Sequence, residues 1–474
     1  MFLRISVNDW NDKMDKTIQN PLGSEPVGKL MLKFSIPSII AMLVGALYNI
    51  VDQLFIGQKV GMLGNAATNV AFPLSTSCIA LALLFGIGGA SAFNLTLGQG
   101  KKDKAPFFMG NAVTMLVISG VVLMVVTLLF LKPLLRLFGS PDEVMPFALD
   151  YVGITAFGFP FLVLTTGGSH LVRADGSPMM TMLCSITGAV INTILDAVFV
   201  FGFGMGMKGA AIATVIGQVI SALMIVWYLA FRPKTVRLER KHLIPSAKCC
   251  QKIFAIGMAS FFNQIAMMIV QIVLNNSLRT YGAQSVYGES IPLSCAGIVM
   301  KISQLVFSIV IGLSQGTQPI ESFNYGAQKY DRVKNAYFLA STIAVGFSFV
   351  CFICFQLFPK QILSVFGDGT DEYFEFGTRF LKRFLFFSWI VALQPVTSTF
   401  FTSIGKAIKG VFLSLTRQII FFLPALLILP RIWGIDGIVY AGPIGDLISS
   451  IIAIVMCFFE FKNMRELENQ MTKE

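Results

Sequence analysis

Apolar runs of about 20 residues recur along the whole chain, and they limit the fold more than any other feature. Residues 36–57 and 107–131 are examples. A run of about that length crosses a bilayer core of about 30 Å as an α-helix. The runs are too long and too evenly apolar for the alternating strands of an outer-membrane barrel. The composition agrees, since 55% of the 474 residues are hydrophobic and 13% are charged. The sequence therefore predicts an all-α membrane protein.

The runs predict twelve transmembrane helices, and an even number places both chain ends on one side of the membrane. The expected spans lie near 34–57, 66–97, 107–131, 146–167, 178–202, 209–231, 253–278, 290–323, 336–357, 376–400, 409–430 and 437–460. Lysine and arginine gather in the loops on the side of the termini. By the positive-inside rule both termini are cytoplasmic, with the protein in the inner (plasma) membrane. The net charge of +11 thus reflects orientation, and no nucleic-acid partner is expected.

The sequence also repeats itself. The longest basic loop, 232–252, lies near the midpoint, and a shift of 228 aligns "GQGKKDKA" (98–105) with "GAQKYDRV" (326–333), pairing Gly98 with Gly326. Each half holds six helices, so both copies share one topology. We expect two six-helix bundles related by a pseudo-two-fold axis along the membrane normal. Two facing bundles leave a cleft between them, which is typical of alternating-access transporters.

The predicted organisation has five parts. They are an N-terminal cytoplasmic segment (1–29), an N-terminal lobe (30–231), a basic cytoplasmic linker (232–252), a C-terminal lobe (253–461) and a cytoplasmic tail (462–474).

Polar residues in three spans of the first lobe share one depth. Asp52, Asp196 and Thr214 each lie five or six residues from the expected outer helix end, roughly 8–9 Å below the surface at about 1.5 Å per residue. Asn192 shares a helix face with Asp196. Carboxylates inside a membrane cost several kcal/mol to bury and are usually functional. These four residues are therefore predicted to bind H⁺ or Na⁺.

Carboxylate, amide and hydroxyl oxygens suit a proton or a small hard cation. Without a cation, two close carboxylates in a low dielectric cannot both stay charged. Further candidates for substrate contacts or for support of the site are Tyr48, Asn49, Gln218 and Asn276.

The second lobe does not repeat this cluster. Shifted by 228, Asp196 falls on Pro424 and Asn192 on Ile420. The charge-handling site is therefore assigned to the first lobe. Structural pairing or snorkelling to the interface is favoured for the ionisable residues inside the second lobe, which are Lys301, Arg417 and Asp446.

The chain resembles the multidrug and toxic compound extrusion (MATE) family over residues 28–460. The resemblance rests on the two sets of six spans and on the motifs "YNIVDQLFIG" (48–57), "GQGKKDKA" (98–105), "RADGSP" (173–178) and "NTILD" (192–196). The pattern is nearest to the prokaryotic DinF-like branch.

The resemblance implies a V-shaped pair of bundles and drug efflux driven by H⁺ or Na⁺, with no cofactor beyond the coupling ion. It also implies a cation site in the first lobe, made of the span-1 Asp52, the span-5 Asn192 and Asp196, and the span-6 Thr214. Another bacterial branch uses carboxylates in spans 7 and 10, which this chain lacks at the matching positions.

Three functions compete. The favoured one is a monomeric antiporter that exchanges H⁺ or Na⁺ for cationic, amphipathic drugs, with membrane lipids as its other partners. A lipid-linked oligosaccharide flippase of the same superfamily is the alternative, and it should line its cleft with several cations. An intramembrane enzyme is disfavoured because the two histidines, His170 and His242, have no nucleophile at useful spacing.

Overall fold

The computed structural model describes residues 20–288, 290–365 and 370–471. Those residues form helices joined by short turns, with no strand among them. Residues 1–19 of the predicted N-terminal segment and residues 472–474 of the predicted tail lie outside this description.

Within the described ranges, eleven helices are long and apolar enough to cross a membrane, and a pair bent by 47° supplies a twelfth span. The predicted spans are confirmed. The first six are α3 (Val27–Lys59), α4 (Met62–Gly98), α5 (Ala105–Leu129), α7–η1–α8 (Met145–Thr155, Ala156–Gly158, Phe159–Ala174), α9–η2 (Pro178–Asp196, Ala197–Gly202) and α10 (Gly206–Phe231).

The second six follow the same order. They are α11 (Ala247–Ala283), α12 (Ser290–Gly326), α13 (Tyr330–Leu357), the bent pair α15 (Asp371–Phe384) with α16–α17 (Ser388–Val391, Leu393–Ser403), α18–η4–α19 (Ala407–Leu415, Thr416–Phe422, Leu423–Trp433) and α20 (Ile435–Met471). One short helix, α2 (Pro21–Ser24), precedes the first span. Others lie between spans, namely α6 (Leu131–Leu137), η3 (Arg240–Leu243) and α14 (Pro359–Ser364).

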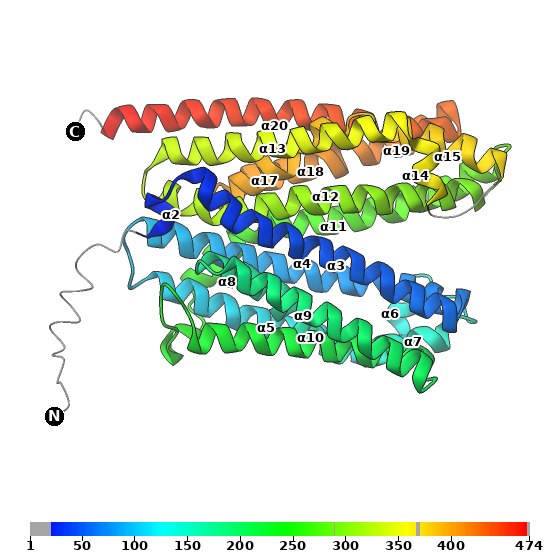
Figure 1. Cartoon of the computed structure of the whole chain (residues 1–474), viewed down its shortest axis with the longest axis horizontal. Helices are drawn as coiled ribbons and strands as arrows, with labels where there is room; N and C mark the ends of the chain where they lie inside the picture. The colour runs from blue at the N-terminus through cyan, green and yellow to red at the C-terminus, as the bar shows by residue number, and fades with distance from the viewer. Residues whose placement is uncertain (1–19, 289, 366–369, 472–474) are drawn as a thin grey trace.

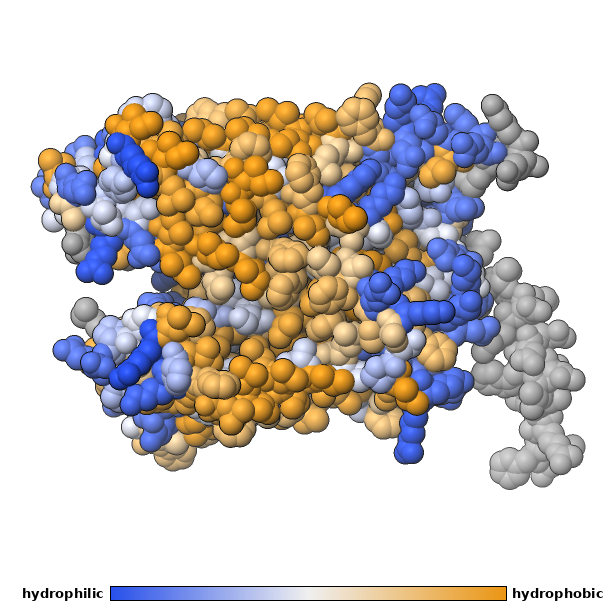
Figure 2. Space-filling view, turned by 180° about the vertical axis from the view of Figure 1, so that it is seen from behind, coloured by the Kyte–Doolittle hydropathy of each residue, from blue (hydrophilic) through white to orange (hydrophobic). Residues whose placement is uncertain are grey.

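The spans form two six-helix lobes that lie side by side (Figure 1). Helix α2 and the end of α20 lie at one end of the molecule. An apolar band surrounds the middle, and a hollow separates the lobes at the opposite end (Figure 2). The lobes meet where α4 packs on α11 and where α3 packs on α12.

The lobes touch backbone to backbone at the symmetry axis. A Cβ on Gly98 would lie 2.1 Å from the carbonyl oxygen of Phe323, and a Cβ on Gly326 would lie 2.2 Å from that of Leu95. Each residue and its counterpart differ by 228 positions. The two contacts are therefore symmetric copies, and the pseudo-two-fold axis passes between the two glycines that the sequence repeat pairs.

Two more close approaches lie in the same half of the lobes. A Cβ on Gly257 of α11 would lie 1.8 Å from the carbonyl oxygen of Leu84, and one on Gly316 of α12 would lie 2.5 Å from the Cα of Ser35. Small residues allow membrane helices to approach this closely. The lobes are thus closed in the half that contains α2 and open in the other half.

A short helix precedes the first span of each lobe, and each of these short helices is bound by the opposite lobe. Lys329 and Arg332, at the α12–α13 corner of the second lobe, donate hydrogen bonds to the carbonyl oxygens of Gly23 and Glu25 at the end of α2. In the same way η3, which precedes α11, packs on α5 of the first lobe. These two attachments, which we call clasps, both lie at the closed end.

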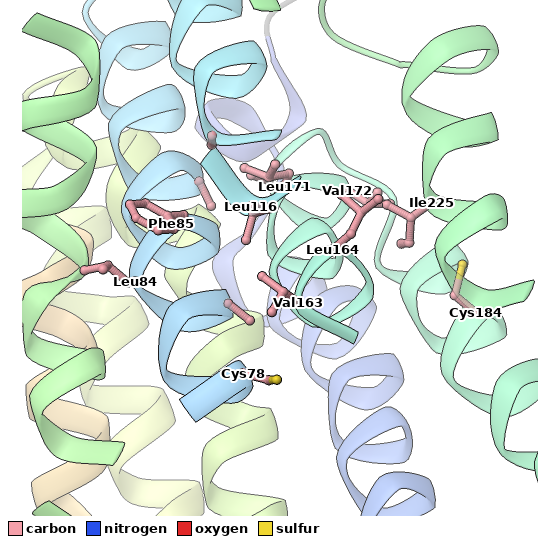
Figure 3. Close-up of a cluster of buried hydrophobic side chains, with 14 of the residues drawn as sticks. Cys78, Leu84, Phe85, Leu116, Val163, Leu164, Leu171, Val172, Cys184 and Ile225 are labelled. Atoms are coloured by element: carbon pink, nitrogen blue, oxygen red, sulfur yellow. The ribbon is translucent and has the colours of Figure 1, made fainter. Parts of the chain in front are cut away.

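The first lobe is organised around α8. Leu171 of α8, Leu116 of α5, Phe85 of α4 and Ile225 of α10 belong to one buried apolar cluster (Figure 3). Dispersion contacts of this kind, rather than the hydrophobic effect, drive helix packing inside a bilayer. This core holds α8 and α10 together and so sets the position of the polar residues on α10.

We predict that Gly326→Val lowers the thermal stability of the purified protein. The new methyl groups would overlap the backbone of α4, and overpacking of this kind costs about 1–3 kcal/mol. Gly346→Val on α13 is the matched control, because a Cβ there meets nothing within 4 Å. Thermal unfolding in detergent tests the prediction, and equal midpoints for the two variants would contradict the backbone contact.

Candidate functional site

The structure brings the four principal candidate residues together in the first lobe. Asp52 lies on α3, Asn192 and Asp196 on α9, and Thr214 on α10. Their exposed fractions are 8%, 3%, 1% and 7%, respectively. All four side chains are therefore buried within a span, although they are polar.

Asp52 and Asp196 form a carboxyl pair. Their side chains lie within hydrogen-bonding reach of each other. The Oδ1 atom of each is buried without a hydrogen-bond donor. Neither carboxyl faces a lysine or arginine in the part of the chain that the structure describes. Two carboxyl groups this close need a shared proton or a bound cation, because two bare charges would repel in a low dielectric.

Asn192 connects the carboxyl pair to α10. Its amide nitrogen lies 3.3 Å from the hydroxyl oxygen of Thr214. With the amide turned by half a rotation, the nitrogen donates to Asp196 Oδ2 at 3.1 Å and the oxygen accepts from the Thr214 backbone N–H at 3.1 Å. The second orientation supplies a donor to the carboxylate, which a buried acceptor requires.

Two tyrosines border the pair. Tyr48 lies one helical turn before Asp52 and interacts electrostatically with both carboxyl groups. Tyr151 of α7 reaches the same place, where it interacts electrostatically with both carboxyl groups and lies near the Thr214 side chain. The sequence analysis missed Tyr151. A signal was present in the sequence. Tyr151 lies six residues after Met145, where its span begins, and this is the depth that the sequence predicts for the other site residues.

The other candidates are placed differently. Asn49 is exposed and donates to the carbonyl oxygen of Gly45 in its own helix at 2.8 Å, so it does not serve the carboxyl pair. Asn276 is exposed on α11 of the second lobe. Gln218 lies on α10 near Gly158, and its Oε1 is buried without a donor.

The helix that carries Asp196 changes form directly after it. The α-helical part of the span ends at Asp196, and the next six residues, Ala197–Gly202, form a π-helix. π-Helical turns are rare and occur frequently at functional sites, since they add a residue to the turn and re-aim the side chains around it.

In the second lobe, the residues predicted to match Asn192 and Asp196 are wrong by two positions. A Cβ on Gly217 would lie 3.1 Å from the Cβ of Asn192, and a Cβ on the matching Gly445 would lie 3.1 Å from that of Phe422. Asn192 thus corresponds to Phe422, a shift of 230, and Asp196 to Leu426. The pairings with Ile420 and Pro424 are replaced by two buried apolar residues.

The register changes inside the helix. Gly176 and Gly405, both with positive φ in the loop before the span, match at a shift of 229. The π-helix η4 ends at Phe422 in the second lobe, whereas η2 begins only after Asn192, at Ala197, in the first. A π-helical turn inserts one extra residue into a helix, so the shift between matching residues rises from 229 to 230. An alignment at one constant shift cannot detect this extra residue.

Of the three ionisable residues that the sequence places inside the second lobe, two form an ion pair. Arg417 Nε lies 2.7 Å from Asp446 Oδ1, and the guanidinium also stacks over Phe307 at 5.5 Å from the ring centroid. Lys301 is exposed. The favoured interpretation of structural pairing holds for Arg417 and Asp446.

The residues present limit which ion the site can hold. No group of three or more His, Cys, Asp and Glu side chains within the described ranges is arranged to hold a metal ion. The first lobe instead offers two carboxyl groups together with amide and hydroxyl oxygens. Hard oxygen ligands of this kind suit a proton or an alkali cation rather than a transition metal.

Two symmetric lobes, closed at one end and separated by a hollow at the other, with a carboxyl pair buried inside one lobe, define a multi-pass membrane transporter rather than an enzyme. A family model described as MatE matches residues 37–198 and 259–427. The chain belongs to the MatE family.

Curated relatives cover nearly the whole chain. It is 24% identical to the multidrug export protein MepA of Staphylococcus haemolyticus over 431 residues, covering 91% of this chain and 93% of that protein. It is 25% identical to MepA of Staphylococcus aureus over 434 residues, with coverages of 91% and 94%. A crystal structure of MATE in complex with MaL6 superposes with a TM-score of 0.88 at 23% identity, covering 95% of this chain and all of that one. The fold is therefore that of the MATE structures.

We predict that Thr214→Val destabilises the first lobe by about 1 kcal/mol, since it removes the hydroxyl that lies 3.3 Å from the Asn192 amide nitrogen. The control is Thr68→Val on α4, whose half-buried hydroxyl donates only within its own helix, at 2.9 Å to the Asn65 carbonyl. The two variants are compared by thermal unfolding in detergent. A loss no larger than that of Thr68→Val would show that the hydroxyl does not connect the site.

Proposed function

We propose that this protein is a secondary active multidrug efflux transporter that exchanges H⁺ or Na⁺ for cationic, amphipathic organic compounds. The observation that carries the proposal is the buried Asp52–Asp196 pair, which has no basic partner among the described residues. We place the protein in the plasma membrane with cytoplasmic termini, as a monomer, because one chain supplies both lobes and the hollow between them.

The proposed cycle begins with the hollow open to the outside. A proton or Na⁺ binds at the carboxyl pair and cancels negative charge. The attraction for a cationic compound weakens, and the compound leaves to the outside. The lobes then rock until the contact at Gly98 and Gly326 separates and the opposite end opens. Release of the ion into the cytoplasm restores the negative charge, and a new cationic compound binds.

Coupling follows from competition between the two cations. An ion and a cationic compound that both favour the same negative charge lower each other's affinity by the same factor. The unpaired Oδ1 atoms of Asp52 and Asp196 are the ligands that we assign to Na⁺, with the Asn192 and Thr214 oxygens beside them. In the proton-coupled case, the shared proton of the pair takes the same role.

The range of compounds is proposed from the relatives. The MepA proteins are named as multidrug exporters, and an acidic site beneath a hollow suits cationic compounds. The flippase alternative is less well supported. A site for a pyrophosphate-linked lipid needs several unpaired cations, whereas Arg417 is neutralised by Asp446, which leaves Lys301 alone of the two predicted candidates.

Asp196→Asn is predicted to abolish ethidium efflux, because an amide cannot exchange a proton or match a carboxylate as a ligand. The protein should still fold, since the two side chains have the same shape. The matched control is Asp150→Asn, whose exposed carboxylate lies 3.5 Å from Lys208 at the surface and which should transport as the wild type does.

Ethidium efflux from proteoliposomes is measured under an imposed pH gradient and then under a sodium gradient. Efflux under only one gradient identifies the coupling ion. Full efflux by Asp196→Asn under either gradient would remove the carboxyl pair from the mechanism.

A further inference from the structure

The linker between the lobes is attached to α5 along part of its length. Asn111 donates to the carbonyl oxygens of His242 at 3.0 Å and Ile244 at 3.2 Å, and it accepts from the Ser246 backbone N–H at 2.6 Å. Thr114 donates to the Leu243 carbonyl oxygen at 2.7 Å. Asn111 and Thr114 lie six and nine residues inside the start of α5, so the linker reaches roughly 9–13 Å along the span.

This attachment leaves an apolar side chain without a protein partner at the membrane boundary. Ile244 is 67% exposed, although its backbone is held against a membrane-spanning helix. Exposed apolar side chains at the edge of a bilayer are covered by acyl chains. The linker is therefore an interfacial segment that contacts lipid, rather than a loop that extends into water.

A groove of about 420 Å³ lies between the linker and the start of α5. It is an open depression on the protein surface rather than an enclosed cavity. Lys104 and Lys241 form its charged side, and Phe107, Ile244 and Pro245 contribute to its apolar side. The groove thus has cations on one side and apolar side chains on the other. A phospholipid has the matching parts, a phosphate and acyl chains.

More positive charge surrounds the groove. Lys252 lies over the ring of Phe108, another lining residue, at 5.0 Å from the centroid, and Lys101 is close enough to interact with Lys252. Asp103 and Glu239 are the nearby acids. The ammonium group of Lys241, 2.7 Å away, lowers the pKa of Glu239. That ion pair is fully exposed, and such pairs are weak enough for a phosphate to displace.

We propose that this groove binds the headgroup of an anionic phospholipid of the cytoplasmic leaflet, with its phosphate between Lys104 and Lys241 and its acyl chains against Phe107 and Ile244. Basic pockets of this kind on the cytoplasmic side of membrane proteins suit anionic headgroups. Because the linker joins the two lobes, a lipid in the groove holds the linker and α5 together.

The test uses the purified full-length protein in detergent, titrated with phosphatidylglycerol or phosphatidylcholine and followed by thermal unfolding. Phosphatidylglycerol should raise the unfolding midpoint of the wild type, and phosphatidylcholine should not. The double variant Lys104→Glu/Lys241→Glu should weaken the apparent phosphatidylglycerol affinity by on the order of ten-fold or more.

The matched control is Lys462→Glu/Arg465→Glu. It makes the same charge change on exposed residues at the cytoplasmic end of α20 and should bind phosphatidylglycerol as the wild type does. If Lys104→Glu/Lys241→Glu does not fold, Lys104→Gln/Lys241→Gln is measured in its place. Equal responses to the two lipids, or equal losses in the groove and control variants, would overturn the proposal. Neither readout depends on transport.

Discussion

The contact between the lobes at Gly98 and Gly326 is the constraint on which the rest of the structure depends. Two main chains approach so closely there that neither position has room for a Cβ. The contact repeats itself across the pseudo-two-fold axis, and both glycines are the last residues of their helices, at the closed end. That end can therefore open only if these two backbone contacts separate. The close approaches at Gly257 and Gly316 lie on the closed side.

Symmetry of the backbone contrasts with asymmetry of charge. Asn192 and Asp196 are matched in the other lobe by Phe422 and Leu426. Asp446, a buried acid of the second lobe, is bound by Arg417. An ion that binds the first lobe therefore changes the charge of one lobe only. Duplication supplied the symmetric contact between the lobes, and divergence of a few side chains confined the carboxyl pair to the first lobe.

The sequence predicted the spans, the repeat and the four clustered residues because each leaves a local mark. Hydrophobic length marks a span, a constant offset marks a repeat, and depth along a helix marks residues that share a level. The π-helical turns leave no such mark, because they depend on packing between helices. They shifted the match of Asn192 in the second lobe from Ile420 to Phe422. The position of Asn49 could not be predicted for a related reason, since a spacing of three residues to Asp52 does not decide which of the two faces the neighbouring helix.

The two clasps bear on how the lobes move. Gly23 and Glu25, which lead into the first lobe, are held by Lys329 and Arg332 of the second, while the linker that leads into the second lobe is held by Asn111 of the first. Each entry segment thus moves with the opposite lobe. Opening the closed end must then either break these hydrogen bonds or bend α3 and α11 near their starts. The linker is bonded as far as Ser246, the residue before α11, so on that side any bend falls within α11 itself.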